Sequence, residues 1–365
     1  MKRRFVFTAG VVALAMLGYL TFTTVDSKTP TAIAAAKTYS GTLYVSAMGG
    51  HFAVAEATID PSNSENPIKI SNLDKIDIGT KTTHPTHDPR IDVNDRTKMY
   101  WSTYKLDPNG MVHVGVSDLK TGKVIKDEAL KLDDRAKWTG ALYCGSGQSA
   151  SSFMPITMTD EAYIDVFDKK TLKLKHRVFL DYKPGETKFY HGTNSPDMKT
   201  FVVAVNLATA GNPNGKIDVL VLDMKALEQG KAKVLKKATI TGDPGKTITF
   251  RQYFTSDGKY LLQSGRDRMI LMDAKTLKVL DEEMVSGENH DVMPTADGKY
   301  AVLTLRESVG KTADGKDLMD GTIQLYDMTA KKLVGKPASA CKACHDAAGV
   351  AGSAVLCGID GNWKK

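Results

Sequence analysis

Short apolar stretches separated by polar turns recur along the whole chain. In each repeat an apolar strand is followed by a turn and by a second strand that ends near an aspartate. The first strands are expected at Thr42–Ser46, Met99–Thr103, Phe153–Thr157, Phe201–Val205, Tyr260–Ser264, Tyr300–Thr304 and Ala354–Gly358. Their starting residues lie between 40 and 59 positions apart. This spacing predicts a repeat architecture built from β-strands.

The second strands and the turns complete the pattern. The second strands are clearest at Val112–Asp118, Tyr163–Asp168, Ile217–Asp223, Met269–Asp273 and Thr322–Asp327. Evenly spaced strands with periodic turns are typical of four-stranded blades around an axis, and stacked blades bury each other's faces. Seven repeats predict an all-β, seven-bladed β-propeller. A β-sandwich is the alternative, but it would be overfilled. Amphipathic helical patterns do not alternate with the strands, which argues against α/β folds.

The N-terminus has the pattern of an export leader. Lys2, Arg3 and Arg4 precede an apolar run over residues 5–22, and small residues follow at 34–36. We predict a signal peptide over residues 1–36 and a single propeller domain over residues 37–365. An uncleaved anchor is the alternative, because the run is close to the roughly 18 residues that a membrane span requires. The expected location is extracytoplasmic, without stable membrane insertion after the leader is removed.

The charge of the chain changes little of this. The formal net charge is +7, and the leader holds Lys2, Arg3, Arg4 and Lys28 against Asp26, which leaves about +4 for the mature domain. A mild positive charge spread along the chain indicates a solvated surface, and no nucleic-acid partner is expected.

The chemistry of the C-terminal region centres on Cys341-Lys342-Ala343-Cys344-His345. This spacing is the one by which c-type haem is attached: two thioethers hold the porphyrin and the histidine ligates the iron. A disulfide between Cys357 and either Cys341 or Cys344 is the alternative, and it would leave Cys144 to pair with the remaining cysteine or stay reduced. Both alternatives stay open. A zinc site is less favoured, because the chain has no second pair of the required spacing.

Three histidines fall at the expected start of innermost strands, which line the axial channel of a propeller. They are His87 before Asp88, His191 before Gly192 and His290 before Asp291, with His345 before Asp346 expected in the same register. Imidazoles gathered at one mouth of the channel could bind Cu or Zn, or ligate a haem iron. A structural role in hydrogen bonding at blade junctions is the competing interpretation. The other histidines show no pattern and are left unassigned: His51, His84, His113 and His176.

The turn sequences carry a family resemblance. Ser195-Pro196-Asp197, Ser256-Asp257-Gly258-Lys259 and Ala296-Asp297-Gly298-Lys299 resemble the turns of SPDGK-type propellers, which include YVTN-repeat proteins, haem d1-binding propellers and heavy chains of quinoprotein amine dehydrogenases. In length, leader and composition the chain also resembles the β subunit of hydrazine synthase from anammox bacteria. That resemblance implies a propeller beside haem-bearing α and γ subunits, hydrazine synthesis from nitric oxide and ammonium, and a location in the anammoxosome lumen.

Several functional hypotheses follow, because a propeller fold alone does not specify an activity. Nucleophile elbows and phosphate-binding loops are missing from the sequence. We therefore expect a non-catalytic or auxiliary subunit of an oxidoreductase complex, with haem-bearing protein partners. Two alternatives stay open: a stand-alone electron-transfer propeller with its own haem c, and a propeller that binds a metal or a tetrapyrrole at the axial histidines.

Overall fold

The computed structural model describes residues 37–46, 49–135, 143–158, 162–311, 317–340 and 358–364. These residues belong to one compact unit, which spans Ala36–Lys365. The unit is almost entirely β-structure, with a single short helix among the described residues, α1 (Met224–Glu228). No helix in this part of the chain has the length and apolar character needed to cross a membrane.

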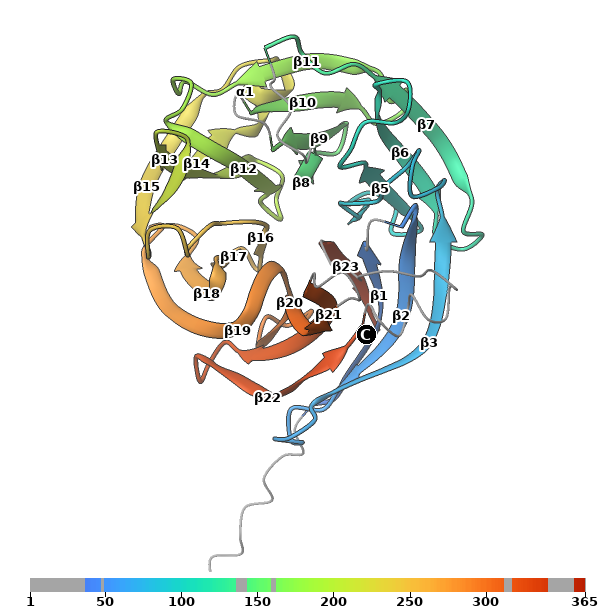
Figure 1. Cartoon of the computed structure of the whole chain (residues 1–365), viewed down its shortest axis with the longest axis vertical. Helices are drawn as coiled ribbons and strands as arrows, with labels where there is room; N and C mark the ends of the chain where they lie inside the picture. The colour runs from blue at the N-terminus through green and yellow to red at the C-terminus, as the bar shows by residue number, and fades with distance from the viewer. Residues whose placement is uncertain are drawn as a thin grey trace, which may run out of the picture. The chain divides into compact units, whose positions relative to one another are not determined.

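Four sheets of four antiparallel strands make up most of the unit (Figure 1), and each is named here as a blade from its innermost strand outward. Blade 1 consists of β23 (Gly358–Trp363), β1 (Tyr39–Ser46), β2 (His51–Ile59) and β3 (Ile68–Asp77). Blade 2 consists of β4 (Arg90–Ile91), β5 (Lys98–Ser102), β6 (Val112–Asp118) and β7 (Val124–Leu130). Blade 3 consists of β8 (Tyr143–Gln148), β9 (Ser152–Thr157), β10 (Tyr163–Asp168) and β11 (Leu174–Phe179). Blade 4 consists of β12 (Thr187–Asn194), β13 (Thr200–Thr209), β14 (Asn212–Asp223) and β15 (Val234–Thr241).

The remaining seven strands form one sheet that divides into two further blades. Its strands are β16 (Gln252–Phe254), β17 (Tyr260–Ser264), β18 (Arg266–Asp273), β19 (Val279–Pro294), β20 (Tyr300–Lys311), β21 (Asp317–Asp327) and β22 (Lys332–Ser339). The first part of β19, up to Met284, pairs mainly with β18, and the part after Asn289 pairs with β20. Strand β19 is therefore the outermost strand of blade 5 and the innermost strand of blade 6.

Hydrophobic clusters link the blades into a closed cycle. Each of six buried clusters contains side chains from two neighbouring blades, in the order 1–2, 2–3, 3–4, 4–5, 5–6 and 6–1. The last of these joins Ile359 of β23 to Val302 of β20. Each fully buried aliphatic side chain contributes about 1.5–3 kcal/mol, so these faces supply most of the stability. The outermost strands β7, β15 and β22 are largely exposed.

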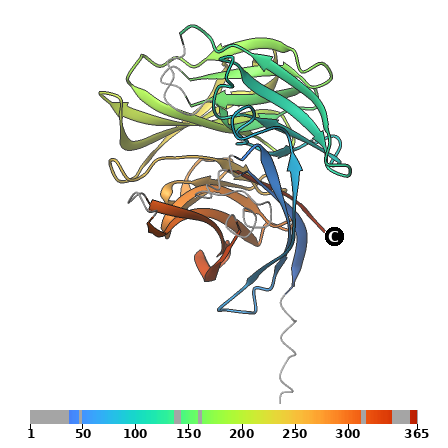
Figure 2. The same cartoon turned by 45° about the vertical axis from the view of Figure 1, so that its right-hand side comes forward.

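The blade count differs from the seven expected. Six predicted first strands are confirmed, as β1, β5, β9, β13, β17 and β20, each the second strand of its blade. The seventh, Ala354–Gly358, lies outside the described residues except for Gly358, which begins β23. Strand β23 pairs with β1 and completes blade 1 instead of opening a new blade. The described residues thus form six blades, closed by the C-terminal strand (Figures 1 and 2).

The recurring aspartates at the ends of third strands have a local cause. In three of these turns the aspartate carboxylate accepts hydrogen bonds from the backbone N–H groups two and three residues later: Asp118, Asp168 and Asp327. In a fourth turn Asp273 accepts from the N–H three residues later. The residue four positions after each of these aspartates has a positive φ angle. Gly122 adopts this conformation without steric cost, whereas Leu172 and Leu277 adopt it while burying their side chains. These hydrogen bonds fix the outer hairpin of each blade.

Candidate functional site

Six buried positions at the inner ends of the blades are structurally equivalent. Each innermost strand is followed directly by a residue whose backbone N–H donates to a carbonyl in or next to the neighbouring strand: Asp92, Ser149, Ser195, Thr255, Thr295 and Lys364. The residues four positions earlier form a set with one member per blade, named here the axial ring: Asp88, Gly145, His191, Arg251, Asp291 and Asp360. All six are buried. The ring therefore places three carboxyl groups, one guanidinium and one imidazole at buried positions where the inner ends of the blades meet.

The ring is held together by ion pairs inside the protein. The Arg251 Nε lies 3.0 Å from Asp88 Oδ1 and 3.9 Å from Asp291 Oδ2. Arg90, two residues after Asp88, lies 3.5 Å from Asp88 and 3.9 Å from Asp291. All four side chains are at most 5% exposed. Two cations thus alternate with two carboxylates, an arrangement that satisfies buried charge.

The carboxyl groups also connect blade 6 to blade 1, blade 1 to blade 2 and blade 2 to blade 3. Asp291 accepts the backbone N–H of Ile359 at 3.0 Å, and Asp360 accepts that of Ile91 at 2.8 Å. Asp88 accepts the hydroxyl of Ser146. Burial raises the pKa of Asp291 to about 6, against the opposing effect of Arg90 and Arg251. Burial likewise raises the pKa of Asp360.

The three predicted axial histidines are brought to this region, and all are buried. His290 stacks on Phe250 with ring centroids 4.2 Å apart, and His191 meets the edge of the same phenyl ring at 5.6 Å. The Nδ1–H of His87 donates to the carbonyl of Tyr143, and the His87 ring lies 5.1 Å from that of Tyr104. Gly145 leaves room for His191, because a Cβ there would lie 3.2 Å from the imidazole.

The electrostatics keep these imidazoles neutral. Burial lowers the pKa of His87 and His191 well below the usual value, and the charge of Arg251 adds to the effect. Burial lowers the pKa of His290 to about 4, although Glu288 acts in the opposite direction. Both ring nitrogens of His191 lack a hydrogen-bond partner among the described residues. These are neutral side chains in an apolar and cationic setting.

The predicted register holds for His87 and His290 and shifts by one residue for His191. His87 and His290 lie one residue before the ring, whereas His191 belongs to it. In blade 1 the corresponding positions are taken by Ile359 and Asp360, where the sequence suggested His345 and Asp346. Cys341, Cys344, His345 and Cys357 lie outside the described residues, so haem attachment and the disulfide stay predictions. Cys144 is buried in β8.

A different set of residues forms the metal-type cluster in the described part of the chain. It consists of His84, His113 and Asp127, with one ligand atom of each within 4.8 Å of the others. The axial histidines form no such cluster among the described residues, and metal binding there stays a prediction. The sequence pattern passed over His84 and His113. One signal was available: the hairpin of β6 and β7 places His113 and Asp127 diagonally across from each other.

A pocket of about 460 Å³ lies at one mouth of the channel, and we name it the mouth pocket. Every blade contributes to its lining, including Arg90, Gln148, Asn194, Tyr253, Met293 and Trp363. Its polar groups are largely engaged with one another: the Tyr253 hydroxyl donates to Asp360 at 3.1 Å, and Arg96 donates to the carbonyl of Gly361 at 3.0 Å. The paired Arg90 forms part of its floor.

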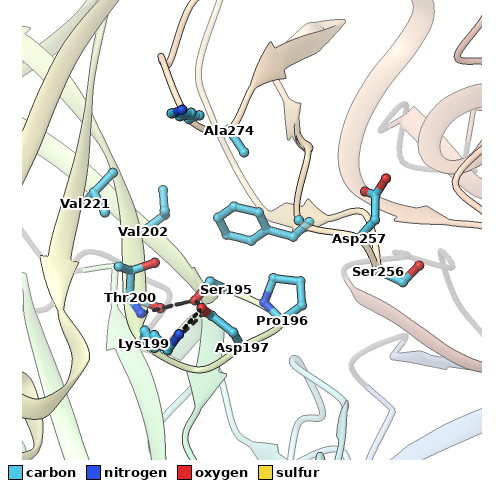
Figure 3. A pocket seen from close by; sticks show the side chains of 13 residues that line it. Ser195, Pro196, Asp197, Lys199, Thr200, Val202, Val221, Ser256, Asp257 and Ala274 are labelled. Atoms are coloured by element: carbon cyan, nitrogen blue, oxygen red, sulfur yellow. Dashed lines mark hydrogen bonds and ion pairs between the residues drawn. The ribbon is translucent and has the colours of Figure 1, made fainter.

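A second pocket, of about 640 Å³, lies between blades 4 and 5 (Figure 3). Val202 and Val221 of blade 4 face Ala274 of blade 5 across it. The turn at Asp197 closes one side, where Ser195 donates to the aspartate at 2.7 Å and Lys199 pairs with it at 3.4 Å. Its polar side chains are those of ordinary blade turns, and they bring together no catalytic group.

Comparisons with known proteins support the fold. No protein-family model and no curated protein matches this chain. A chain of the nidogen–laminin complex is similar with a TM-score of 0.56 and 10% identity, over 88% of this chain and 97% of that one. A chain of Kuenenia stuttgartiensis hydrazine synthase is similar with a TM-score of 0.49 and 16% identity, over 69% of this chain and 66% of that one. A chain of the mitotic checkpoint complex has a TM-score of 0.47 and 9% identity, over 81% and 78%. At 10% identity the similarity to the nidogen–laminin chain supports the propeller-like fold alone, and function must be argued from the site.

Proposed function

We propose that this chain is a non-catalytic propeller subunit of an extracytoplasmic redox assembly whose protein partners carry haem. The observation that carries the proposal is the buried ion-pair network of Arg90, Arg251, Asp88 and Asp291. Their charges are directed at one another and hidden from solvent. Groups held in this way stabilise a rigid disc and are not offered to a substrate.

Because these central charged groups are paired with one another, we expect the function to lie on the outer surfaces. Removing one member of a buried ion-pair network is strongly unfavourable, so the network resists opening. A rigid propeller offers loops on two faces as docking surfaces for partners. This favours a scaffold over an enzyme that turns over a substrate inside the channel.

The redox setting is supported by the sequence. The leader over residues 1–36 would take the chain to a compartment where covalent haem is assembled, and Cys341, Cys344 and His345 have the spacing of a haem c attachment site. In its specific form the proposal is a subunit of a hydrazine synthase-like complex, which supports hydrazine formation from nitric oxide and ammonium in the anammoxosome lumen. That form rests on the resemblance in length, leader and composition.

Size-exclusion chromatography of a membrane-free extract of the source cells, under native conditions, tests the proposal. The chain should elute in a complex with haem-staining polypeptides, at a mass well above that of a monomer. Elution as a monomer without haem-bearing partners would contradict the scaffold role.

A pyridine haemochrome spectrum of the isolated chain tests the electron-carrier alternative. The chain should be produced with its leader in a host that exports proteins and attaches haem c, beside a Cys341→Ser/Cys344→Ser variant. A haem signal that the variant loses would place haem on this subunit. Equal spectra without covalent haem would exclude the electron-carrier alternative.

A further inference from the structure

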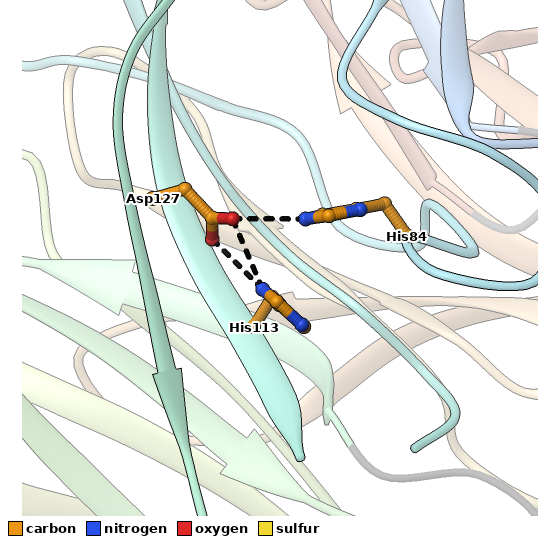
Figure 4. A group of neighbouring side chains, drawn as sticks. All are labelled: His84, His113 and Asp127. Carbon is orange, nitrogen blue, oxygen red and sulfur yellow. Dashed lines mark hydrogen bonds and ion pairs between the residues drawn. The ribbon is translucent and has the colours of Figure 1, made fainter. Parts of the chain in front are cut away.

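A second group of histidines lies on blade 2, apart from the axial ring (Figure 4). The Nε2 of His84 lies 2.9 Å from Asp127 Oδ2, and the Nδ1 of His113 lies 3.0 Å from Asp127 Oδ1. The two imidazole rings have centroids 4.2 Å apart. Both histidines therefore turn a nitrogen toward one carboxylate. We name this group the rim site.

The fold builds the rim site from three segments. His113 lies on β6 and Asp127 on β7, where Asp127 pairs across the ladder with Gly115. His84 comes from the connection between β3 and β4. Gly79 permits its position, because a Cβ at residue 79 would lie 2.3 Å from the Nδ1 of His84. A backbone turn without a side chain thus lets a loop histidine reach the hairpin.

Neighbouring groups orient both imidazoles. The Nε2 of His113 faces the carboxylate of Asp107 at 3.5 Å. Asp107 is itself fixed by the backbone N–H groups of Asn109 at 2.8 Å and Met111 at 2.7 Å. The Nδ1 of His84 lies 2.9 Å from the hydroxyl of Thr83. Metal-binding histidines are commonly oriented in this way, with the second ring nitrogen toward a carboxylate or other acceptor.

The distances suit a small divalent ion with few adjustments. Zinc–ligand bonds of about 2.0–2.1 Å in a tetrahedron separate the ligand atoms by about 3.3 Å. The nitrogen–oxygen distances of 2.9 and 3.0 Å are a few tenths shorter, as expected for ligands that hydrogen bond to one another without an ion. His113 is mostly buried, whereas the Asp127 side chain is 32% exposed. That exposure gives an ion a path to the site and an open fourth position for water.

We propose that His84, His113 and Asp127 form a binding site for one divalent transition-metal ion, of the class that includes Zn²⁺ and Cu²⁺. Two imidazoles and one carboxylate are ligands of this class. Three protein ligands and a solvent-facing fourth position are typical of sites at which a bound water or an external ligand completes the coordination. The site is independent of the scaffold function proposed above.

Titration of the metal-free chain with Zn²⁺ tests the proposal. The background should carry Cys341→Ser and Cys344→Ser, because those thiols would otherwise bind zinc themselves. Calorimetry should show one Zn²⁺ per chain, with affinity lowered about 100-fold or more by Asp127→Asn and by His84→Gln. Asp127→Asn is the sharper variant, since an asparagine keeps a hydrogen bond to His113 but removes the charge. His176→Gln, a partly exposed histidine outside the cluster, is the matched control and should bind as the background does.

A spectroscopic readout separates metal binding from loss of structure. The ring of Trp101 lies 6.0 Å from that of His84, so Cu²⁺ at the rim site should quench its fluorescence. Quenching should disappear in Asp127→Asn, while the circular dichroism and the thermal unfolding midpoint stay close to those of the control. Absence of binding in the background chain, or equal Zn²⁺ affinity in Asp127→Asn and the control, would overturn the proposal. So would binding that responds to His191→Leu instead.

Discussion

The axial and rim histidines are the same residue type in opposite surroundings. His191 and His290 lie against Phe250 and near Arg251, and their pKa values are lowered. His113 lies against Asp127, and hydrogen bonding to that carboxylate raises its pKa. His87 and His290 share one position of the repeat and His191 takes the next position, whereas the rim histidines follow no repeated position.

This comparison shows that a repeated position is a poor guide to a ligand role. In a propeller one position of every blade reaches the axis whatever the residue does there. A carboxylate facing two imidazoles has a more specific chemical meaning, because it supplies the charge that a cation requires. The axial residues therefore provide rigidity, and the rim residues provide a candidate binding group.

The largest expected effect is on the axial charges. Arg251→Met should lower the free energy of unfolding by about 3–5 kcal/mol, because it leaves Asp88 and Asp291 buried without this cation. Urea unfolding measures the change. Lys98→Met, which removes a solvent-exposed pair with Asp95, is the control and should stay close to the wild type. Equal stability of both variants would show that the axial network is not a structural support.

A smaller, pH-dependent effect is expected at His191. Folding lowers the pKa of His191, so the unfolded chain binds a proton at this residue more tightly than the folded chain does. The folded state is therefore destabilised through His191 as the pH falls below about 6.5, and this loss is absent above that pH. His191→Leu should remove about 1.4 kcal/mol of this loss per pH unit below that value. The free energies of unfolding of the two proteins, compared at pH values from about 5 to about 8, measure this difference. The range spans the unfolded pKa of about 6.5.

Subtraction is needed because other groups titrate in the same range. The pKa of Asp291 is raised to about 6, so protonation of Asp291 stabilises the folded state as the pH falls from that value toward 3.8. This effect opposes the destabilisation through the histidines. The variant retains Asp291, so the difference between the proteins isolates residue 191. Parallel stability curves would mean that folding does not lower the pKa of His191.

The smallest effect is expected at the rim in the absence of metal. Asp127→Asn should then lower stability by about 1 kcal/mol or less, as for partly exposed ion pairs. With Zn²⁺ at about 100 times its dissociation constant, the unsubstituted site should gain about 2.7 kcal/mol, whereas a variant site weakened about 100-fold or more should gain about 0.4 kcal/mol or less. Thermal unfolding with and without Zn²⁺ measures both. A large metal-free loss would assign the rim residues to structural support.

The strand pattern predicted the blades well and their closure poorly. Val112–Asp118 and Tyr163–Asp168 are confirmed as β6 and β10, since alternation and turn residues act locally. The pairing of β23 with β1 joins residues more than 300 positions apart, and no local pattern carries that information. The repeat count was therefore one higher than the six blades described.

The site was predicted in part for the same reason. The sequence register brought His87, His191 and His290 to the axis, because a strand position repeats from blade to blade. The partnership of Arg251 with Asp88 depends on which blades face each other across the axis, which the register does not state. His84 reaches the rim site from a connecting loop, whose path depends on tertiary packing.

The pairing of β23 with β1 also determines the order in which the blades can be completed. Blade 1 lacks its innermost strand until residues 358–363 have been synthesised, so the cycle of blades stays open up to that moment. Blades 2 to 6 can therefore pair their own strands before the cycle of blades closes, whereas blade 1 cannot.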